Sequence, residues 1–151
     1  MSSEVGDRDR LWVLLVYSLP REPSAPRVAV WRKLKKLGAV HAQDAVWTLP
    51  ASATTRERFR WLVQEIREAG GEAQVWIARE ELPGQDERLV AAFIEQAERG
   101  YQEILHALDD PAHSRVDLAR AYTQVRAVDY FHAPSGDLVR ARLEAADGSG
   151  R

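Results

Sequence analysis

Seven consecutive apolar or aromatic residues, Leu11–Tyr17, constrain the fold more than any other stretch of this 151-residue chain. A segment that crosses a membrane needs roughly 18 or more apolar residues, so this run is far too short to span one. A short apolar run without polar alternation is typical of a strand that is covered on both faces. We therefore expect a β-strand that lies in the middle of a sheet.

The patterns that follow this strand alternate between helix and strand. A helix is expected from about Ala25 to Leu37, and Gly38 is a typical stop. Strands at Val40–Ala42 and Val46–Leu49 would form a hairpin, and an amphipathic helix then ends at Gly70–Gly71 before a fourth strand. The order βαββαβ predicts an α+β fold of the ferredoxin-like kind, with an antiparallel sheet and two helices on one face.

The rest of the chain shows helical spacing of its apolar residues. We expect a ferredoxin-like core over residues 10–82, a helical extension over residues 83–146 that packs on the core, and disordered tails at residues 1–9 and 147–151. The extension would hold a long helix, in which Gly100 either kinks the helix or allows a close approach, and two shorter helices. The five tryptophans fall one per element of the core, and we expect all of them in the core or at its edge.

Several classes of chemistry are excluded or disfavoured by composition and spacing. The chain has no cysteine, which excludes disulfides, thiolate metal sites and cysteine nucleophiles. Its four histidines show no spacing typical of a helical metal site, and no phosphate-binding loop or nucleophile motif is present. We expect a cytoplasmic protein that is not an enzyme, with no catalytic residue, no metal, no cofactor and no membrane contact.

The expected first helix carries an unusual charge pattern. It holds all three lysines of the chain, although the formal net charge of the chain is −2. The four cations of this helix are Arg32, Lys33, Lys35 and Lys36. On a helical wheel they lie opposite the apolar Val30 and Leu34, and no acidic residue occurs between Glu22 and Asp44. Two interpretations stay open, a solvated surface or a contact with the phosphates of a nucleic acid.

Two stretches of the chain resemble a known family. The first combines an S-L-P turn, the pattern R-x-x-x-W-R-x-L-x-x-L-G-A and a hairpin that ends in L-P. These positions are Ser18–Leu19–Pro20, Arg27, Trp31–Arg32, Leu34, Leu37–Gly38–Ala39 and Leu49–Pro50. The second stretch, YTQVRAVDYFHAP, contains Asp129, Tyr130 and Phe131. Together they resemble the N-terminal domain of the chromate-resistance ChrB family over roughly residues 10–146.

The resemblance implies a DNA-binding transcriptional regulator of chromate resistance. Its partners would be double-stranded operator DNA, a second copy of the chain in a homodimer, and chromate as an effector. Full-length members carry a C-terminal domain, so a separate ChrB C-terminal-type domain is a further candidate partner. The matching basic residues are Arg27, Arg32, Lys33, Lys35 and Lys36.

The resemblance also implies a core similar to the middle domain of the phenylacetate-degradation repressor and to small CRISPR-associated nucleases. Those nucleases carry a metal-binding aspartate at the end of the first strand. Here Tyr17 and Ser18 stand at that place, which argues against a metal-dependent nuclease.

Two non-enzymatic alternatives remain besides DNA binding. One is a protein-interaction module, to which the long helices after residue 84 would contribute. The other is a sensor of chromate or another oxyanion that does not itself bind DNA. A helix N-terminus with arginines nearby can hold a dianion, and the candidate residues are Arg21, Ser24 and Arg27. Ser24 is also the expected N-cap of the first helix.

Overall fold

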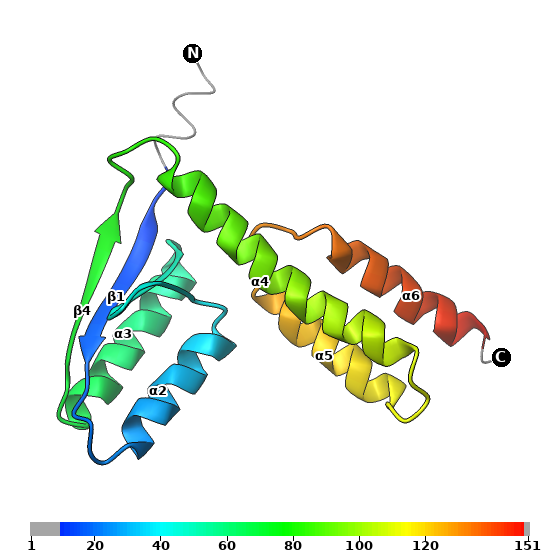
Figure 1. Ribbon diagram of the computed structural model, residues 1–151, viewed down its shortest axis with the longest axis horizontal. Helices are drawn as coiled ribbons and strands as arrows, with labels where there is room; N and C mark the ends of the chain where they lie inside the picture. Colours follow the sequence, from blue (N-terminus) through cyan, green and yellow to red (C-terminus); the bar gives the residue numbers. More distant parts are fainter. Residues whose placement is uncertain (1–9, 150–151) are drawn as a thin grey trace. The chain divides into compact units, whose positions relative to one another are not determined.

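The computed structural model describes residues 10–149 (Figure 1). The expected disordered tail at residues 1–9 lies outside the described residues. The chain forms two compact units that divide between Leu89 and Val90, later in the sequence than the expected boundary at residue 82. Among residues 10–149, no helix is long and apolar enough to cross a membrane.

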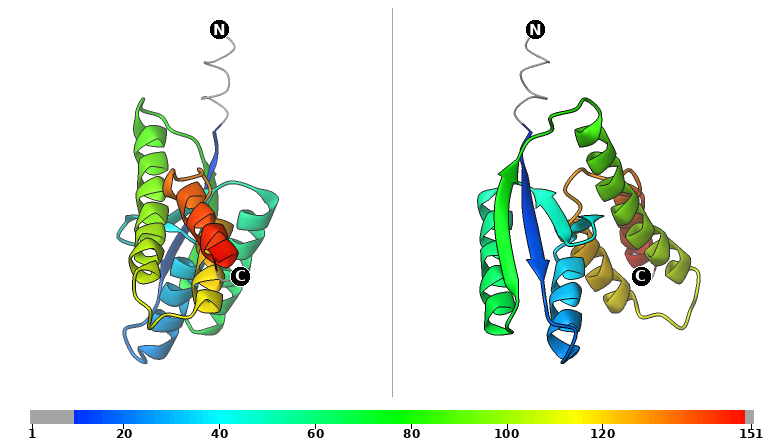
Figure 2. Two further views of the ribbon diagram at one scale, coloured as in Figure 1. Left: turned by 90° about the vertical axis from the view of Figure 1, so that its right-hand side faces the viewer. Right: turned by 60° about the vertical axis from the view of Figure 1, so that its left-hand side comes forward.

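The first unit is a four-stranded antiparallel sheet with two helices on one face (Figures 1 and 2). Its elements are β1 (Trp12–Ser18), α2 (Ala25–Lys36), β2 (Val40–Gln43), β3 (Val46–Pro50), α3 (Ala53–Glu68) and β4 (Glu72–Ala78). The strand order is β2-β3-β1-β4, so β1 is central and β4 is an edge strand. This arrangement confirms the predicted ferredoxin-like α+β fold.

The central strand β1 is fully covered on only one of its faces. Val13 and Leu15 have no exposed surface, and they pair across the ladder with Leu49 and Trp47 on the face that the helices cover. Leu14 on the other face is only half-buried. The expectation that both faces are covered was therefore wrong in part, because both helices of an antiparallel βαββαβ unit pack on the same face.

The C-terminus of α2 shows why the helix ends where the sequence predicted. Gly38 has φ +73°, a left-handed conformation that costs glycine little. The N–H of Gly38 donates to the carbonyl of Lys35 at 3.1 Å, and the N–H of Ala39 donates to the carbonyl of Leu34 at 3.1 Å. These two bonds form a Schellman motif, which satisfies carbonyls that the helix leaves open.

The N-terminus of α2 differs from the expectation. Ser24 occupies the N-cap position, but its side chain makes no capping hydrogen bond. Its φ of −79° and ψ of −18° are already helical, which turns the side chain away from the first turn. Ser52 before α3 is extended, and its side chain accepts a hydrogen bond from the N–H of Thr55 at 3.1 Å.

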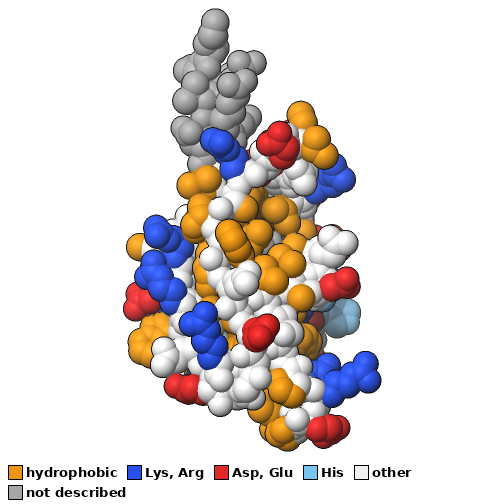
Figure 3. All heavy atoms as spheres, turned by 90° about the vertical axis from the view of Figure 1, so that its left-hand side faces the viewer, with side chains coloured by type: hydrophobic (Ala, Val, Ile, Leu, Met, Phe, Trp, Pro, Cys, Tyr) orange, Lys and Arg blue, Asp and Glu red, His pale blue; other side chains and the backbone are white. Residues whose placement is uncertain are grey.

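Three of the five tryptophans lie at the surface, so the expectation that all five lie in the core or at its edge was wrong in part. Trp12 and Trp47 are buried, whereas Trp31, Trp61 and Trp76 are 50%, 68% and 56% exposed. Trp76 lies on edge strand β4 on the sheet face that carries no helix, as its pairing with Leu14 shows. Figure 3 shows hydrophobic side chains gathered on the side of the molecule where β4 and β1 lie.

The second unit is helical. α4 (Gln85–Leu108) begins in the first unit and continues into the second, where α5 (Arg115–Ala127) and α6 (Ser135–Ser149) follow. A Cβ on Gly100 would lie 3.0 Å from Cγ2 of Val125, which confirms that Gly100 allows a close approach. α6 extends beyond its predicted end at residue 146, because one glycine costs a helix only about 1 kcal/mol.

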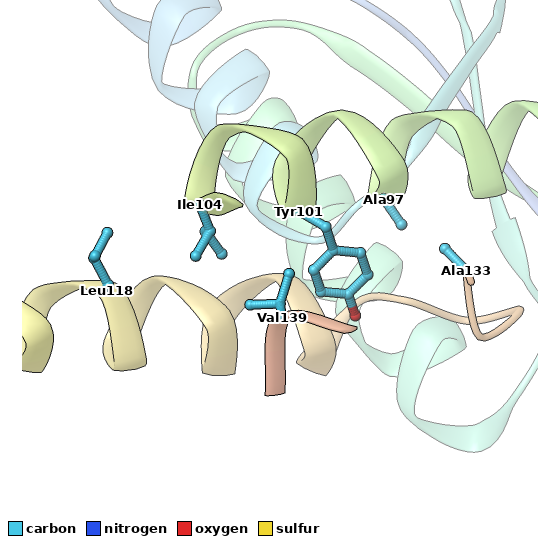
Figure 4. Packing of buried hydrophobic residues seen from close by; sticks show 6 residues of the cluster. All are labelled: Ala97, Tyr101, Ile104, Leu118, Ala133 and Val139. Carbon is cyan, nitrogen blue, oxygen red and sulfur yellow. The ribbon is translucent and has the colours of Figure 1, made fainter. Parts of the chain in front are cut away.

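The core of the second unit is built around Tyr101. Buried residues from the three helices and from the segment between α5 and α6 surround it, namely Ala97, Ile104, Leu118, Ala133 and Val139. Figure 4 shows the Tyr101 ring beside Val139 of α6.

Candidate nucleic-acid interface

The two sides of α2 differ as the sequence predicted. Val30 and Leu34 are fully buried beneath the helix, whereas its cations point to solvent. The exposed cations are Arg32, Lys33, Lys35 and Lys36. The apolar side chains of α2 are therefore needed for its packing on the sheet. The cations take no part in that packing.

One of the four cations is neutralised by a neighbouring helix. Nζ of Lys33 lies 2.5 Å from Oε1 of Glu65 on α3, and both side chains are partly exposed. Glu65 is 32 positions away in the sequence. No residue near Lys33 in the sequence indicates this partner, which the packing of α2 against α3 brings to it. An exposed pair of this kind contributes at most about 1 kcal/mol to stability.

The other cations have no acidic partner among the described residues. Nζ of Lys35 lies 5.8 Å from the ring centroid of Trp31, a cation–π contact that leaves the charge facing solvent. Arg32 and Lys36 are exposed, and neither forms an ion pair with an acid of the described part of the chain. We call Arg32, Lys35 and Lys36 the basic face.

The basic face also has a structural effect within α2. Lys35 and Lys36 lie in the last turn of the helix, together with Lys33. Cations there interact favourably with the helix dipole, by about 0.3–1 kcal/mol each. This effect explains cations at the end of α2, but it does not explain why Lys35 and Lys36 have no acidic ion-pair partner among the described residues.

The residues predicted for an oxyanion lie at the other end of α2. Arg21, Ser24 and Arg27 are all exposed, and the first turn contains no acidic side chain. No side-chain hydrogen bond joins the three among the described residues. Burial raises the pKa of the Tyr17 phenol, while a hydrogen bond with Trp47 and the charge of Arg27 lower it. The charge of Arg27 therefore acts on the end of β1, and the oxyanion site stays a prediction.

The end of β1 and the histidine of the first unit make structural contacts. β1 ends at Ser18, after Tyr17, without a carboxylate. The ring of His41 stacks on Trp47 with 4.6 Å between centroids, and its Nε2 contacts the carbonyl of Asp44. Within residues 10–149, no group of three or more potential metal-ligating side chains is close enough to hold an ion.

A comparison with family models shows to which family the chain belongs. The family model described as "Protein ChrB, N-terminal" matches residues 27–124. This match covers more than half of the chain. The chain belongs to the ChrB N-terminal family. The match includes the whole basic face and begins at Arg27, and it confirms the resemblance stated from the sequence.

One curated relative supports the same family. "Protein ChrB" from Cupriavidus metallidurans is 29% identical over 121 residues, which cover 80% of this chain and 34% of the relative. The chain thus spans about a third of the length of that relative. No solved structure matches the chain.

The ChrB-like closing stretch, which begins in α5, forms a buried polar cluster in the second unit. Asp129 accepts hydrogen bonds from the Tyr101 hydroxyl at 2.8 Å and from the N–H of Ala133 at 2.9 Å. Nη1 of Arg126 lies 3.6 Å from Oδ2 of Asp129. The cluster fixes the chain between α5 and α6, so we assign Asp129 a structural role.

The buried cluster should make stability depend on alkaline pH. Burial and the hydrogen bond to Asp129 raise the pKa of Tyr101 to about 12, from 10.0. Below pH 10 the phenol is protonated in both the folded and the unfolded chain. Above pH 10 the unfolded chain loses this proton first, so the free energy of unfolding should fall by up to about 2–3 kcal/mol toward pH 12. Chemical denaturation of the wild type and Tyr101→Phe between pH 9 and pH 12 measures this effect. Parallel pH profiles would show that Tyr101 titrates normally.

Proposed function

We propose that this chain is the DNA-binding part of a transcriptional regulator of chromate resistance. In this proposal the basic face of α2, Arg32, Lys35 and Lys36, contacts the phosphates of operator DNA. The observation that carries it is an exposed face of one charge sign without an acidic partner among the described residues. Membership in the ChrB N-terminal family supports a regulatory role in chromate resistance.

The chemistry of the basic face suits a phosphate backbone. Lysine and arginine side chains that replace counterions on DNA gain free energy from the release of those ions. Arg32 adds a planar guanidinium that can donate two hydrogen bonds to one phosphate. Lys33 is held by Glu65, so we expect it to contribute less than the other three cations.

Phosphate contacts set position and orientation, whereas base contacts set sequence preference. Arg27 and Trp31 lie on the same helix as the basic face, and both are exposed. Both side chains could contact a base or a neighbouring phosphate. We therefore expect their replacement to change sequence preference more than general affinity.

The test compares two duplexes of equal length and composition. One carries the DNA immediately upstream of the coding sequence of this protein, and the other is a shuffled version of it. A regulator should bind the upstream duplex at least about tenfold more tightly, since specific sites commonly exceed non-specific ones by far more than that. Equal affinities would contradict a regulator, and no binding to either duplex would contradict the nucleic-acid interface itself.

A further inference from the structure

The two edges of the sheet in the first unit differ in how well they are protected. At one edge, β2 has only four residues, and its ladder is irregular between His41 and Gln43. Short and irregular edge strands resist pairing with other chains. At the other edge, β4 has seven residues, and all seven pair in unbroken register with β1. β4 is therefore the edge that is regular enough to accept another strand.

The outer edge of β4 also lacks the side chains that usually block such pairing. The stretch from Ala73 to Ala78 contains no charged residue and no proline, and Trp76 and Ile77 are 56% and 46% exposed. Lysines, prolines and inward-pointing charges are the common protections of an edge strand. An unprotected strand of this length is a favourable site for strand addition.

A groove runs along this edge between β4 and α3. Residues of both elements line it, including Arg60, Gln64, Arg67 and Glu68 from α3 and Val75 from β4. Nη2 of Arg67 lies 3.4 Å from the carbonyl oxygen of Ala73, so this end of α3 is level with the start of β4. Because α3 and β4 run in opposite directions, Gln64 is about level with Val75. Arg60 lies one helical turn closer to the N-terminus of α3 than Gln64.

Twofold symmetry makes this groove complementary to itself. If two β4 strands pair antiparallel about an axis beside Val75, Gln74 of one copy lies opposite Trp76 of the other. The axis then also passes close to Gln64 of both α3 helices. Arg60 precedes Gln64 by one turn and Glu68 follows it by one turn, so Arg60 of one copy faces Glu68 of the other. The symmetric pairing thus forms two ion pairs and leaves no like charges opposed at these positions.

The spacing of the elements fits the same arrangement. Paired strands lie about 4.8 Å apart, and packed helices lie about 8–10 Å apart. α3 packs over β4 and β1, so the axis beside β4 would place the two α3 helices at about that helix–helix distance. The α3 helix of each copy would fill the groove of the other.

We propose that the β4 edge and the groove-facing side of α3 form a homodimer interface. Two copies would join their sheets into one eight-stranded antiparallel sheet, with Arg60 of each copy paired with Glu68 of the other. The interface does not include the basic face of α2, so that face stays free in the dimer. A dimer would present two basic faces, as the twofold symmetry of many operators requires.

The experiment is a DNA-free measurement of mass against concentration by analytical ultracentrifugation on the full chain. The monomer mass is 17.0 kDa, and we expect the wild type to approach twice that value by about 100 µM. Arg60→Glu and Glu68→Arg each place like charges across the axis, and each should weaken dimerisation at least about tenfold. The double variant Arg60→Glu with Glu68→Arg restores opposite charges and should restore the dimer.

Arg58→Glu is the matched control, since Arg58 is an exposed arginine of α3 that does not line the groove. It should leave the dimer intact. Circular dichroism of each variant checks that the fold is unchanged, which is expected because Arg60 and Glu68 are exposed. A monomeric wild type would overturn the proposal. Single variants that dimerise as tightly as the wild type would overturn it as well, and so would a double variant that stays monomeric. None of these results bears on the proposed DNA contact.

Discussion

Replacing Arg32, Lys35 and Lys36 together by glutamate should lower the affinity for duplex DNA by about 10³-fold at low salt. At low salt, each phosphate contact that releases a counterion raises the affinity by about a factor of ten, which is about 1.4 kcal/mol. Reversing the three charges removes the contacts and adds repulsion. The fold should be unaffected, because these side chains are exposed and the helix is anchored by Val30 and Leu34.

Fluorescence anisotropy with a labelled upstream duplex measures this loss. A triple variant of the second unit, Arg99→Glu, Arg120→Glu and Arg140→Glu, changes the net charge by the same amount at exposed positions. It should retain affinity within about tenfold of the wild type if the basic face is the site of contact. Equal losses of affinity in both triple variants would show that DNA binding depends on the total charge of the protein and not on the basic face of α2.

Asp129→Ala should destabilise the second unit by about 3–5 kcal/mol. Asp129 is 6% exposed, and its carboxylate accepts hydrogen bonds from Tyr101 and from the N–H of Ala133. Its removal leaves these buried donors unsatisfied and takes away the nearer of the two carboxylates beside Arg126, since Asp137 lies at 3.9 Å and is exposed. Breaking a buried charge network on one side costs this much because the remaining polar groups lose their partners without regaining water.

The position of the tryptophans allows the effect to be assigned to one unit. All five tryptophans precede residue 90, so their fluorescence reports the first unit, whereas circular dichroism near 222 nm reports helices of both units. We expect part of the helical signal of Asp129→Ala to be lost at lower urea concentration than the fluorescence transition. Asp137→Ala is the control, because Asp137 also contacts Arg126 but is 73% exposed, and it should cost less than about 0.5 kcal/mol. Equal midpoints for both variants would contradict a structural role of Asp129.

The order of the elements could be predicted from the sequence because local patterns determine it. The apolar stripe through Val30 and Leu34 and the stop at Gly38 depend only on neighbours within α2. The sidedness of α2 follows from helical geometry alone, so the exposure of the basic face was predictable too. The relation to the ChrB family was also detectable, because its motif lies in one continuous stretch around Trp31 and Arg32.

The remaining features depend on contacts between distant elements. Nothing near Lys33 in the sequence indicates Glu65, because only the packing of α2 beside α3 joins them. The surface positions of Trp61 and Trp76 were missed because hydrophobic residues are usually buried, and a single sequence does not show which face of a helix or sheet stays uncovered. The self-complementary spacing of Arg60 and Glu68 becomes meaningful only once β4 is known to be an edge strand.

The most direct test of the central claim is the salt dependence of DNA binding. The logarithm of the association constant of the wild type, plotted against the logarithm of the salt concentration, should have a slope of about −3 per bound chain, since three phosphate contacts contribute about −0.9 each. Replacement of Arg32, Lys35 and Lys36 by alanine should bring the slope close to zero. If the alanine variant keeps the slope of the wild type, the basic face of α2 does not contact DNA, and the proposed interface is wrong.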